Sequence, residues 1–366
     1  MSAVLDPLRD ALEHLKRAER PLILIGPEGA PAAEKLLRLA DALGACVLTT
    51  PDALSVVSGS RSTGVFSFGA STRARRAVES SDVILALSAL GEFSSRMGRA
   101  FASHTLIQVA ESVTEAQGSR KPDVLLVGPV VALVTRLLDA FEASPRPVRA
   151  PWLPAEPSDE ASPPHPARAG TMHPAAAMRA LRRGLPPGSR LCLDVTSGAL
   201  HAYEQLVTRP DDRVFSSIER SACMGEALLA SLGIRLASGA PTLALVGDWG
   251  FCMAPQELHA AVELGLSRYV VLVWSNGGGA FIGAGVKQQG LHVPDAAWAF
   301  RAPVSFARVA EGLGAHGVVV TEAGELTHAV AAGLAHDRPV LIDAKIDPEA
   351  PVPAGDRFLT LGIERS

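Results

Sequence analysis

Short apolar runs recur along this sequence, and each is separated from the next by a segment long enough to form a helix. In the first half the runs occupy residues 21–26, 46–50, 82–87, 104–109 and 123–128. Apolar runs of this length are typical of strands buried on both faces, and helical crossovers between them make neighbouring strands parallel. The pattern therefore predicts an α/β fold in which a mainly parallel sheet is covered by helices on both faces.

The same alternation starts again in the second half, after a proline-rich interruption. The predicted strands there are residues 190–195, 242–246, 269–273, 317–320 and 339–342, and the predicted helices are 174–183, 225–237, 254–264, 304–313 and 323–335. Between the halves, prolines recur too densely for a helix or a central strand, which indicates an extended linker. We therefore expect two Rossmann-like domains, residues 1–143 and 174–366, joined by a linker over 144–173.

The composition excludes several classes of protein. The chain of 366 residues carries a net charge of −4 and has no basic stripe, which disfavours nucleic acid as a partner. The N-terminus lacks the apolar core of a signal peptide, and no apolar stretch is long enough to span a bilayer. The cysteines are scattered among apolar neighbours, which favours buried free thiols over disulfides or zinc. They are Cys46, Cys192, Cys223 and Cys252. We expect a cytoplasmic protein.

Polar or glycine-rich turns follow three predicted strands of the second domain. They comprise residues 194–198, 247–250 and 274–279. In an open α/β sheet, ligands bind outside the carboxyl ends of the strands. We therefore expect the three turns to converge on one site.

The groups in these turns suit a diphosphate that is held through a divalent cation. Asp248 offers a carboxylate, Ser275 or Asn276 a neutral oxygen, and Gly277 a backbone carbonyl. Magnesium takes such oxygen ligands and completes its octahedron with phosphate oxygens. Glycines let backbone N–H groups approach the phosphates, and helix N-termini favour negative charge.

Each turn also has an ordinary structural explanation. A Gly-Asp pair at a strand end is common as a turn or helix cap, and a triple glycine is typical of a flexible loop. Thr196 and Ser197 suit a helix N-cap as well as a contact to phosphate. The joint order and spacing of the three turns, more than any one of them, favours a cofactor site.

The order of these motifs resembles that of thiamine-diphosphate enzymes of the acetolactate-synthase-like family. Gly247-Asp248-Trp249-Gly250 resembles their first cofactor motif, and Ser275, 27 positions after Asp248, falls where an asparagine of their second motif stands. The first predicted domain resembles their central domain, and the second resembles their C-terminal, diphosphate-binding domain. The resemblance implies thiamine diphosphate and Mg²⁺ as cofactors.

The resemblance also implies which residues surround the cofactor. Met224 would wedge the two rings of thiamine diphosphate into their V shape, although a methionine here also suits an ordinary core. The carbonyl of Ala222 would accept from the 4′-amino group. The implied cofactor contacts are Thr196, Ser197, Gly198, Ala222, Cys223, Met224, Gly247, Asp248, Trp249, Gly250, Asn276, Gly278 and Phe281. The implied metal ligands are Asp248, Ser275, Asn276 and Gly277. The spacing from Asp248 favours Ser275 as the metal ligand, whereas the amide oxygen of Asn276 is the better ligand chemically.

The chain departs from the family pattern at both motifs. Trp249 replaces a glycine and crowds the phosphate side, and Trp274-Ser275 replaces the usual pair of asparagines. The first domain has no G-x-G-x-x-G fingerprint, so FAD or ADP binding there is not expected.

A predicted loop over residues 283–292 falls where family members place substrate contacts. It carries Lys287, Gln288, Gln289 and His292, of which the last three are the candidate substrate residues, with a solvated loop as the alternative. Residues 280–290 contain no acid, whereas simple decarboxylases of the family carry one there. The resemblance therefore favours carboligation over simple decarboxylation.

The sequence starts where the pyrimidine-binding domain of the family should end. That domain holds the glutamate that activates the cofactor, so we expect a separate partner subunit to supply it within a hetero-oligomer (a dimer of heterodimers or larger). The implied function is the diphosphate-binding subunit of a split enzyme that decarboxylates a 2-oxo acid and ligates the acyl anion to an acceptor. The alternatives are a simple decarboxylase subunit and a non-catalytic relative acting as a regulatory or scaffold subunit. A nicotinamide dehydrogenase is disfavoured, because no dinucleotide fingerprint is present.

Overall fold

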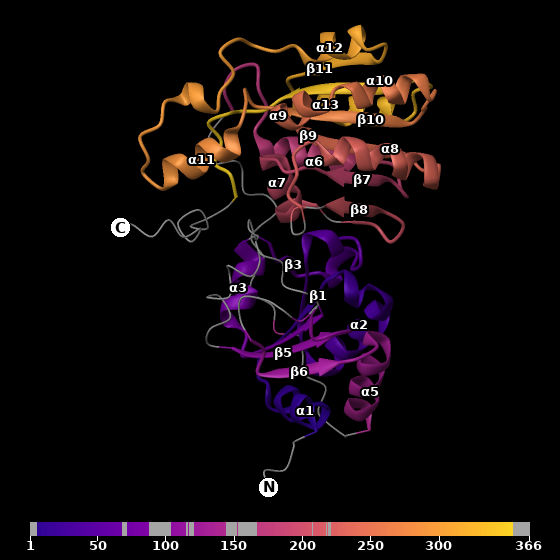
Figure 1. The fold of residues 1–366 in the computed structure, drawn as a ribbon, viewed down its shortest axis with the longest axis vertical. Helices are drawn as coiled ribbons and strands as arrows, with labels where there is room; N and C mark the ends of the chain where they lie inside the picture. Colours follow the sequence, from indigo (N-terminus) through magenta and orange to yellow (C-terminus); the bar gives the residue numbers. More distant parts are fainter. Residues whose placement is uncertain are drawn as a thin grey trace. The chain divides into compact units, whose positions relative to one another are not determined.

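The computed structural model describes residues 6–67, 72–87, 104–114, 116, 121–143, 152, 167–206, 208–216, 218 and 221–353. The chain divides into two compact units, Met1–Asp159 and Glu160–Ser366 (Figure 1). Each unit contains a six-stranded sheet whose neighbouring strands are parallel, which confirms the predicted fold class. Most of the predicted linker over 144–173 lies outside the described residues.

The first unit orders its strands β3-β2-β1-β4-β5-β6. The strands are β1 (Pro21–Ile25), β2 (Cys46–Thr49), β3 (Gly64–Val65), β4 (Val83–Leu87), β5 (Thr105–Ala110) and β6 (Val124–Val127). The helices are α1 (Pro7–Arg17), α2 (Ala33–Leu43), α3 (Thr72–Ser80) and α5 (Val130–Glu142). Successive residues of a strand point to opposite faces. Ile23 and Ile25 accordingly pack in the core that includes α1, α2 and α5, and Leu22 and Leu24 pack in the core that includes α3.

Trp152, from the predicted linker, packs on the first unit. Its indole N–H donates to the carbonyl of Pro21 (2.8 Å), and its own carbonyl accepts from the thiol of Cys46 (2.8 Å). Burial raises the pKa of the Cys46 thiol to about 11, so the thiol keeps the proton that it donates. Near the other end of the linker, Met172 forms a parallel bridge with Ile346 of the second unit. These linker residues are thus held by the sheets on either side.

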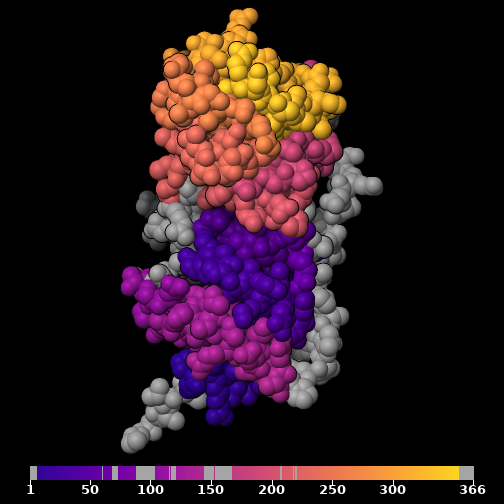
Figure 2. All heavy atoms as spheres, turned by 90° about the vertical axis from the view of Figure 1, so that its right-hand side faces the viewer, coloured from indigo at the N-terminus to yellow at the C-terminus, as the bar shows by residue number. Residues whose placement is uncertain are grey.

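The second unit orders its strands β11-β12-β10-β9-β7-β8. The strands are β7 (Arg190–Leu193), β8 (Arg213–Ser216), β9 (Thr242–Gly247), β10 (Tyr269–Ser275), β11 (His316–Val320) and β12 (Val340–Lys345). The helices are α6 (Pro174–Gly184), α7 (Ser197–Gln205), α8 (Glu226–Ser238), α9 (Asp248–Met253), α10 (Gln256–Glu263), α11 (Ala280–Gln288), α12 (Phe306–Gly312) and α13 (Ala323–Gly333). The last strand, β12, is internal to the sheet, and Figure 2 shows the yellow atoms of the last described residues beside orange atoms of the same unit.

Helices cover both faces of the second sheet, as predicted. Val271 and Val273 of β10 point into a core shared with α8, α10 and α12. On the opposite face, Val270 lies against α13, and Trp274 lies against Gly198 at the start of α7. The strand order reverses between β7 and β9, and in such sheets the crevice for a ligand opens at the carboxyl ends of these strands.

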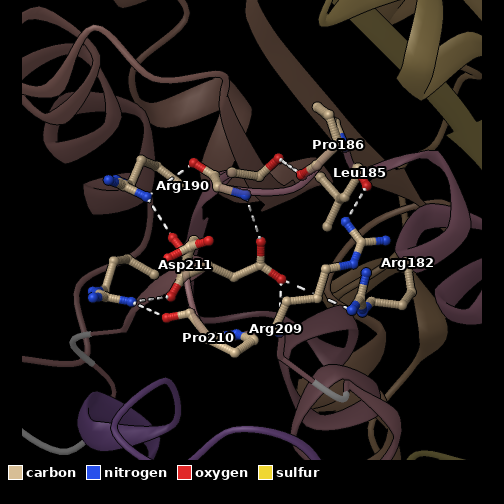
Figure 3. A network of polar contacts seen from close by, with 11 residues as sticks. Arg182, Leu185, Pro186, Arg190, Arg209, Pro210 and Asp211 are labelled. Atoms are coloured by element: carbon tan, nitrogen blue, oxygen red, sulfur yellow. Dashed lines mark hydrogen bonds and ion pairs between the residues drawn. The ribbon is translucent and has the colours of Figure 1, made fainter.

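Arginine side chains and their hydrogen-bond partners lie at the opposite, amino-terminal edge of this sheet (Figure 3). The buried Asp212 carboxylate accepts from the backbone N–H groups of Gly188 (3.1 Å) and Arg209 (2.9 Å). The Arg190 guanidinium donates to the carbonyl of Asp211 (2.9 Å). These contacts fix the starts of β7 and β8, at the edge away from the predicted site.

The prediction that all four cysteines are buried is wrong for two of them. Cys46 and Cys192 are buried, whereas Cys223 and Cys252 are exposed, and all four are free thiols. The exposed pair lies in the turn before α8 and in the short helix α9, where Phe251 and Ala254 enter the core and Cys252 does not. Within the ranges that the structure describes, no helix is long and apolar enough to cross a membrane.

Candidate functional site

Asp248 lies at the carboxyl edge of the second sheet, where it begins α9 directly after β9. Its carboxylate is 1% exposed, and its Oδ2 accepts from the backbone N–H groups of Gly278 (2.6 Å) and Asn276 (3.1 Å). Its Oδ1 is buried without a hydrogen-bond partner in the described part of the chain. Burial raises the pKa of Asp248 to about 6, although the surrounding N–H groups and the Lys345 ammonium act to lower it. A buried, unpaired carboxylate oxygen is costly, and a cation ligand would satisfy it.

The turn that binds Asp248 depends on two glycines. Gly277 has φ +88° and Gly278 has φ +135°, conformations that L side chains rarely adopt. A Cβ on Gly278 would also collide with the carbonyl oxygen of Trp298. The carbonyl of Gly277, a predicted metal ligand, accepts a hydrogen bond from the N–H of Phe300 (2.8 Å), which leaves one of its two lone pairs for a metal.

Asn276 connects this turn to the start of α7. Its amide Nδ2 donates to the hydroxyl of Ser197 (3.2 Å), which leaves the amide oxygen as its acceptor. Thr196 is the N-cap of α7, and its hydroxyl accepts from the N–H of Gly198 (3.4 Å), so the ordinary structural role of Thr196 is present. A Cβ on Gly247 would lie 2.9 Å from the same hydroxyl, so the turns after β7 and β9 touch here.

Ser275 faces away from this connection. Its hydroxyl accepts from the ammonium of Lys345 (3.2 Å), which also binds both oxygens of Asp343 (2.8 and 2.9 Å). Lys345 was not among the predicted site residues, because the last strand was predicted to end at residue 342, whereas β12 continues to Lys345 beside Ser275. The alternation Asp343-Ala344-Lys345, which puts both charges on one face of a strand, was the available signal.

Asp194, at the end of β7, holds the segment that contains Met224. Its Oδ2 accepts from the N–H of Gly225 (2.9 Å) and its Oδ1 from the N–H of Ala227 (3.3 Å). Burial raises the pKa of this carboxyl. In the segment itself, Ala222 has a positive φ of 49°, and Met224 is half-buried. A positive φ on a non-glycine residue is strained and is kept only where neighbouring contacts impose it.

A cavity of about 350 Å³ opens beside the turn after β10. The predicted site residues that line it are Ser197, Asn276, Gly277 and Gly278. His201 and Trp274 line it from the side of α7, with ring centroids 6.2 Å apart. His201 is buried, and burial lowers its pKa to about 3, so its ring is neutral at pH 7. Its Nδ1 has no hydrogen-bond partner among the described residues, and neither has Nε1 of Trp274.

The predicted substrate loop is largely helical. Residues 280–288 form α11, because Gly279 opens the helix after the glycine turn and no proline interrupts it. One face of α11 lines the cavity, at the spacing i, i+3, i+4 and i+7: Ala280, Gly283, Ala284 and Lys287. Gln288, Gln289 and His292, the predicted substrate residues, are not among the residues that line it. Lys287, one position earlier, is.

Trp249 packs against the start of α11. A Cβ added to Gly279 would lie 2.9 Å from the indole, so the absence of a side chain there accommodates the bulk of Trp249. The residue that departs from the family motif is therefore packed against a glycine two residues after the turn at Gly277. Phe281, another predicted cofactor contact, lies in the first turn of α11 and is half-buried.

The donor set fits a hard divalent cation only in part. Asp248 Oδ1, the amide of Asn276 and the free lone pair of Gly277 are oxygen ligands of the kind that Mg²⁺ takes. No group of three or more His, Cys, Asp or Glu side chains that could hold a metal occurs among the described residues. A metal at Asp248 would therefore need further ligands, such as phosphate oxygens.

The fold and the site place the second unit in the class of α/β domains that bind their ligand at the carboxyl edge of a parallel sheet. Residues 196–344 match the family described as "Thiamine pyrophosphate enzyme, C-terminal TPP binding domain", and residues 8–137 match its "central domain". The two matches together cover most of the chain. The chain therefore carries the central and C-terminal domains of thiamine pyrophosphate enzymes.

Individual relatives agree with this assignment. A Mycobacterium tuberculosis protein named as an acetolactate synthase large subunit is 30% identical over 186 residues, which are 50% of this chain and 32% of the relative. The oxalyl-CoA decarboxylase of Escherichia coli K12 is 28% identical over 132 residues, or 36% of this chain and 23% of the relative. The aligned regions thus span a third or less of these relatives.

A solved structure shares the fold. The thiamine diphosphate-dependent 4-hydroxybenzoylformate decarboxylase of Rhodococcus jostii RHA1 superposes with a TM-score of 0.70 at 23% sequence identity. The superposition covers 93% of this chain and 64% of that chain. This chain therefore shares its fold with that protein.

Proposed function

We propose that the second unit binds the diphosphate of thiamine diphosphate through Mg²⁺, and that the protein is the diphosphate-binding part of an enzyme acting on a 2-oxo acid. The carrying observation is the Asp248 carboxylate, whose Oδ1 is buried without a partner while its Oδ2 binds the N–H groups of the turn after β10. A divalent cation would satisfy Oδ1 and bridge it to a phosphate.

The neighbouring residues complete this proposal. Asn276 and the carbonyl of Gly277 would be the further metal ligands, and the hydroxyl of Ser197 and the N-terminus of α7 would hold the phosphates. When bound, the cofactor supplies the electron sink for cleavage of the bond next to the keto carbon. Asp194 fixes the segment that holds Met224 and the carbonyl of Ala222, and these two groups would contact the cofactor rings.

We further propose that a pyrimidine-binding domain on a partner subunit completes the active site and supplies the activating glutamate. The turns at Asp248 and Asn276 account for the diphosphate side of the cofactor alone. A dimer of heterodimers would then be the smallest symmetric assembly.

Carboligation is our preferred reaction, with simple decarboxylation as the alternative. The relatives include a protein named as an acetolactate synthase subunit and decarboxylases, so both chemistries occur among them. The absence of an acid from residues 280–290 favours carboligation. A non-catalytic relative is a second candidate, and the ammonium of Lys345 against Ser275 favours it, because a positive charge there opposes a metal.

Calorimetric titration of the full chain with thiamine diphosphate and Mg²⁺ tests the proposal. We expect the unaltered chain to bind the cofactor. Asp248→Asn should abolish this binding, and excess Mg²⁺ should not restore it. The titration is repeated with the product of a neighbouring reading frame of pyrimidine-domain size, followed by a carboligation assay with pyruvate. Failure to bind the cofactor both with and without that product contradicts the enzyme proposal. Turnover by this chain alone contradicts the partner proposal only.

A further inference from the structure

Lys345 ends β12 beside Ser275, which ends β10, because the two strands pair in parallel register at these positions. The Lys345 ammonium binds both carboxylate oxygens of Asp343 (2.8 and 2.9 Å) and the Ser275 hydroxyl (3.2 Å), and it lies 3.5 Å from the carbonyl oxygen of Val304. An ammonium has three protons. These partners therefore use all of its donors and hold it in one place.

The anchor of this lysine is a fully buried carboxylate. Asp343 is 0% exposed and also accepts a hydrogen bond from the N–H of Phe306 (3.1 Å), at the start of α12. The Lys345 ammonium lies 5.9 Å from the centre of the Phe306 ring. An ion pair whose carboxylate is buried and accepts a further hydrogen bond is strongly constrained in geometry. Lys345 is thus a fixed part of the sheet and differs from a mobile surface lysine.

Ser275 stands between this ion pair and the turn that binds Asp248. It is 8% exposed and does not line the cavity, whereas Asn276, the next residue, does. A divalent cation on the Ser275 hydroxyl would sit beside the fixed ammonium, and like charges at such distances repel. The geometry therefore makes Ser275 a poor metal ligand and gives its hydroxyl a different task.

We propose that Lys345 is a positioning residue of the cofactor site, which acts through Ser275 to fix the end of β10. From that end the turn presents the N–H groups of Asn276 and Gly278 to Asp248. The amide of Asn276 is then held where it can ligate the metal, which resolves the choice between Ser275 and Asn276. This inference rests on the proposed function, since it specifies how the same site is held in shape.

The test measures the dissociation constant of preformed Mg²⁺–thiamine diphosphate on the full chain, followed by tryptophan fluorescence. The first variant is Ser275→Ala, which removes the hydroxyl and leaves the Lys345–Asp343 ion pair intact. The second is the double substitution Asp343→Asn with Lys345→Met, which avoids a buried, unpaired carboxylate. Ser275→Thr keeps a hydroxyl in the same strand and serves as the conservative variant.

A matched control is available at the opposite edge of the sheet. Ser189 is also a buried serine, 2% exposed, and its hydroxyl donates to the carbonyl of Pro186 (2.6 Å). Ser189→Ala therefore removes a comparable hydrogen bond far from the cofactor turn. Urea denaturation without ligand, run on every variant, separates a loss of fold stability from a loss of cofactor affinity.

We expect Ser275→Ala and the double substitution each to raise the dissociation constant about tenfold, as loss of an outer contact to a metal ligand does. Combining Ser275→Ala with the double substitution should add little, because both break the same link. Ser275→Thr should restore most of the affinity, and Ser189→Ala should leave it unchanged.

Two results overturn the inference. If the double substitution tightens binding, Ser275 is itself the metal ligand and Lys345 merely opposes the metal. If the variants lose stability without losing affinity, the lysine is structural only. Either result requires that the unaltered chain binds the cofactor; if it does not, the proposed function fails first and in a distinguishable way.

Discussion

The carboxylate of Asp194 accepts a 2.9 Å hydrogen bond from the backbone N–H of Gly225 and so ties the end of β7 to the start of α8. A second bond from the N–H of Ala227 (3.3 Å) uses the other oxygen. Gly250 of α9 approaches the same carboxylate so closely that a Cβ there would collide with Oδ2. One buried side chain therefore sets the relative positions of the Met224 segment and the helix that begins with Asp248.

We predict that Asp194→Asn destabilises the protein by about 1–3 kcal/mol, because an amide replaces one acceptor oxygen by a donor that faces a backbone N–H. The affinity for thiamine diphosphate should fall as well, since the Met224 segment loses its anchor. Urea denaturation and cofactor titration measure the two effects.

The control for this substitution is Asp212→Asn. Asp212 is likewise buried and accepts from two backbone N–H groups, but it directly precedes β8, at the amino-terminal edge of the sheet. It should cost comparable stability and leave cofactor affinity intact. Equal losses of affinity in both variants would show that Asp194 acts on the fold as a whole and has no specific role at the site.

Gly278→Ala should be more costly than an ordinary glycine substitution. Gly278 combines φ +135° with a backbone carbonyl in the way of any Cβ, so we predict a loss of roughly 3 kcal/mol or more in the free energy of unfolding. Gly239→Ala is the control, because Gly239 has φ +65° and no atom within 4 Å of the added Cβ. It should lose only about 1 kcal/mol. Equal losses would mean that backbone strain alone, without the contact to Trp298, decides the cost.

The order of strands and helices could be read from the sequence because burial on both faces leaves a continuous apolar run. β10 was expected at 269–273 and extends to Ser275, since Trp274 is apolar and Ser275 still pairs in the ladder. Short or mixed elements gave no such signal: β8, with an exposed Arg213 and a half-buried Ser216, was not predicted. Partial burial removes the pattern on which the prediction depends.

Site residues that belong to local sequence motifs could be predicted, whereas a residue that reaches the site through strand pairing could not. Asp248 and the glycine turn follow strand ends in the sequence itself. Lys345 becomes relevant only because β12 lies next to β10, a relationship between residues 70 positions apart. The helical state of α11 was missed for a related reason, because a glycine such as Gly283 is typical of a loop until its close packing against Trp298 is known.

Asp248 should contribute less to the stability of the ligand-free protein as pH rises through its titration. Burial raises its pKa from 3.8 to about 6, so the folded state holds the proton more tightly than the unfolded state. Stability from this group is complete below pH 3.8 and lost by about pH 6, a difference of about 3 kcal/mol. Asp248→Asn should remove this slope. Denaturation curves of both proteins between pH 4 and 7 measure it, and parallel curves would contradict the shift.

Metal binding should follow the opposite pH dependence. Only the ionised carboxylate ligates a cation, so the affinity for Mg²⁺–thiamine diphosphate should fall about tenfold per unit as pH drops below about 6. Above pH 7 the affinity should level off. A flat profile from pH 5 to 7 would show that Asp248 is already ionised at pH 5 or is not a ligand.

His201 gives a contribution of opposite sign in nearly the same pH range. Burial lowers its pKa from 6.5 to about 3, so the unfolded state binds the proton more tightly. Stability from this group is complete above pH 6.5 and is lost as pH falls toward 3, by roughly 5 kcal/mol in total. His201→Phe keeps a ring against Trp274, removes the titration and removes a buried Nδ1 without a partner. We therefore expect this variant to gain stability over the unaltered chain at pH 5 and to approach it above pH 7.

The slopes of Asp248 and His201 partly cancel in the unaltered chain, so denaturation of the two single variants should reveal slopes of opposite sign. Slopes of the same sign would mean that one of the two side chains reaches water in solution.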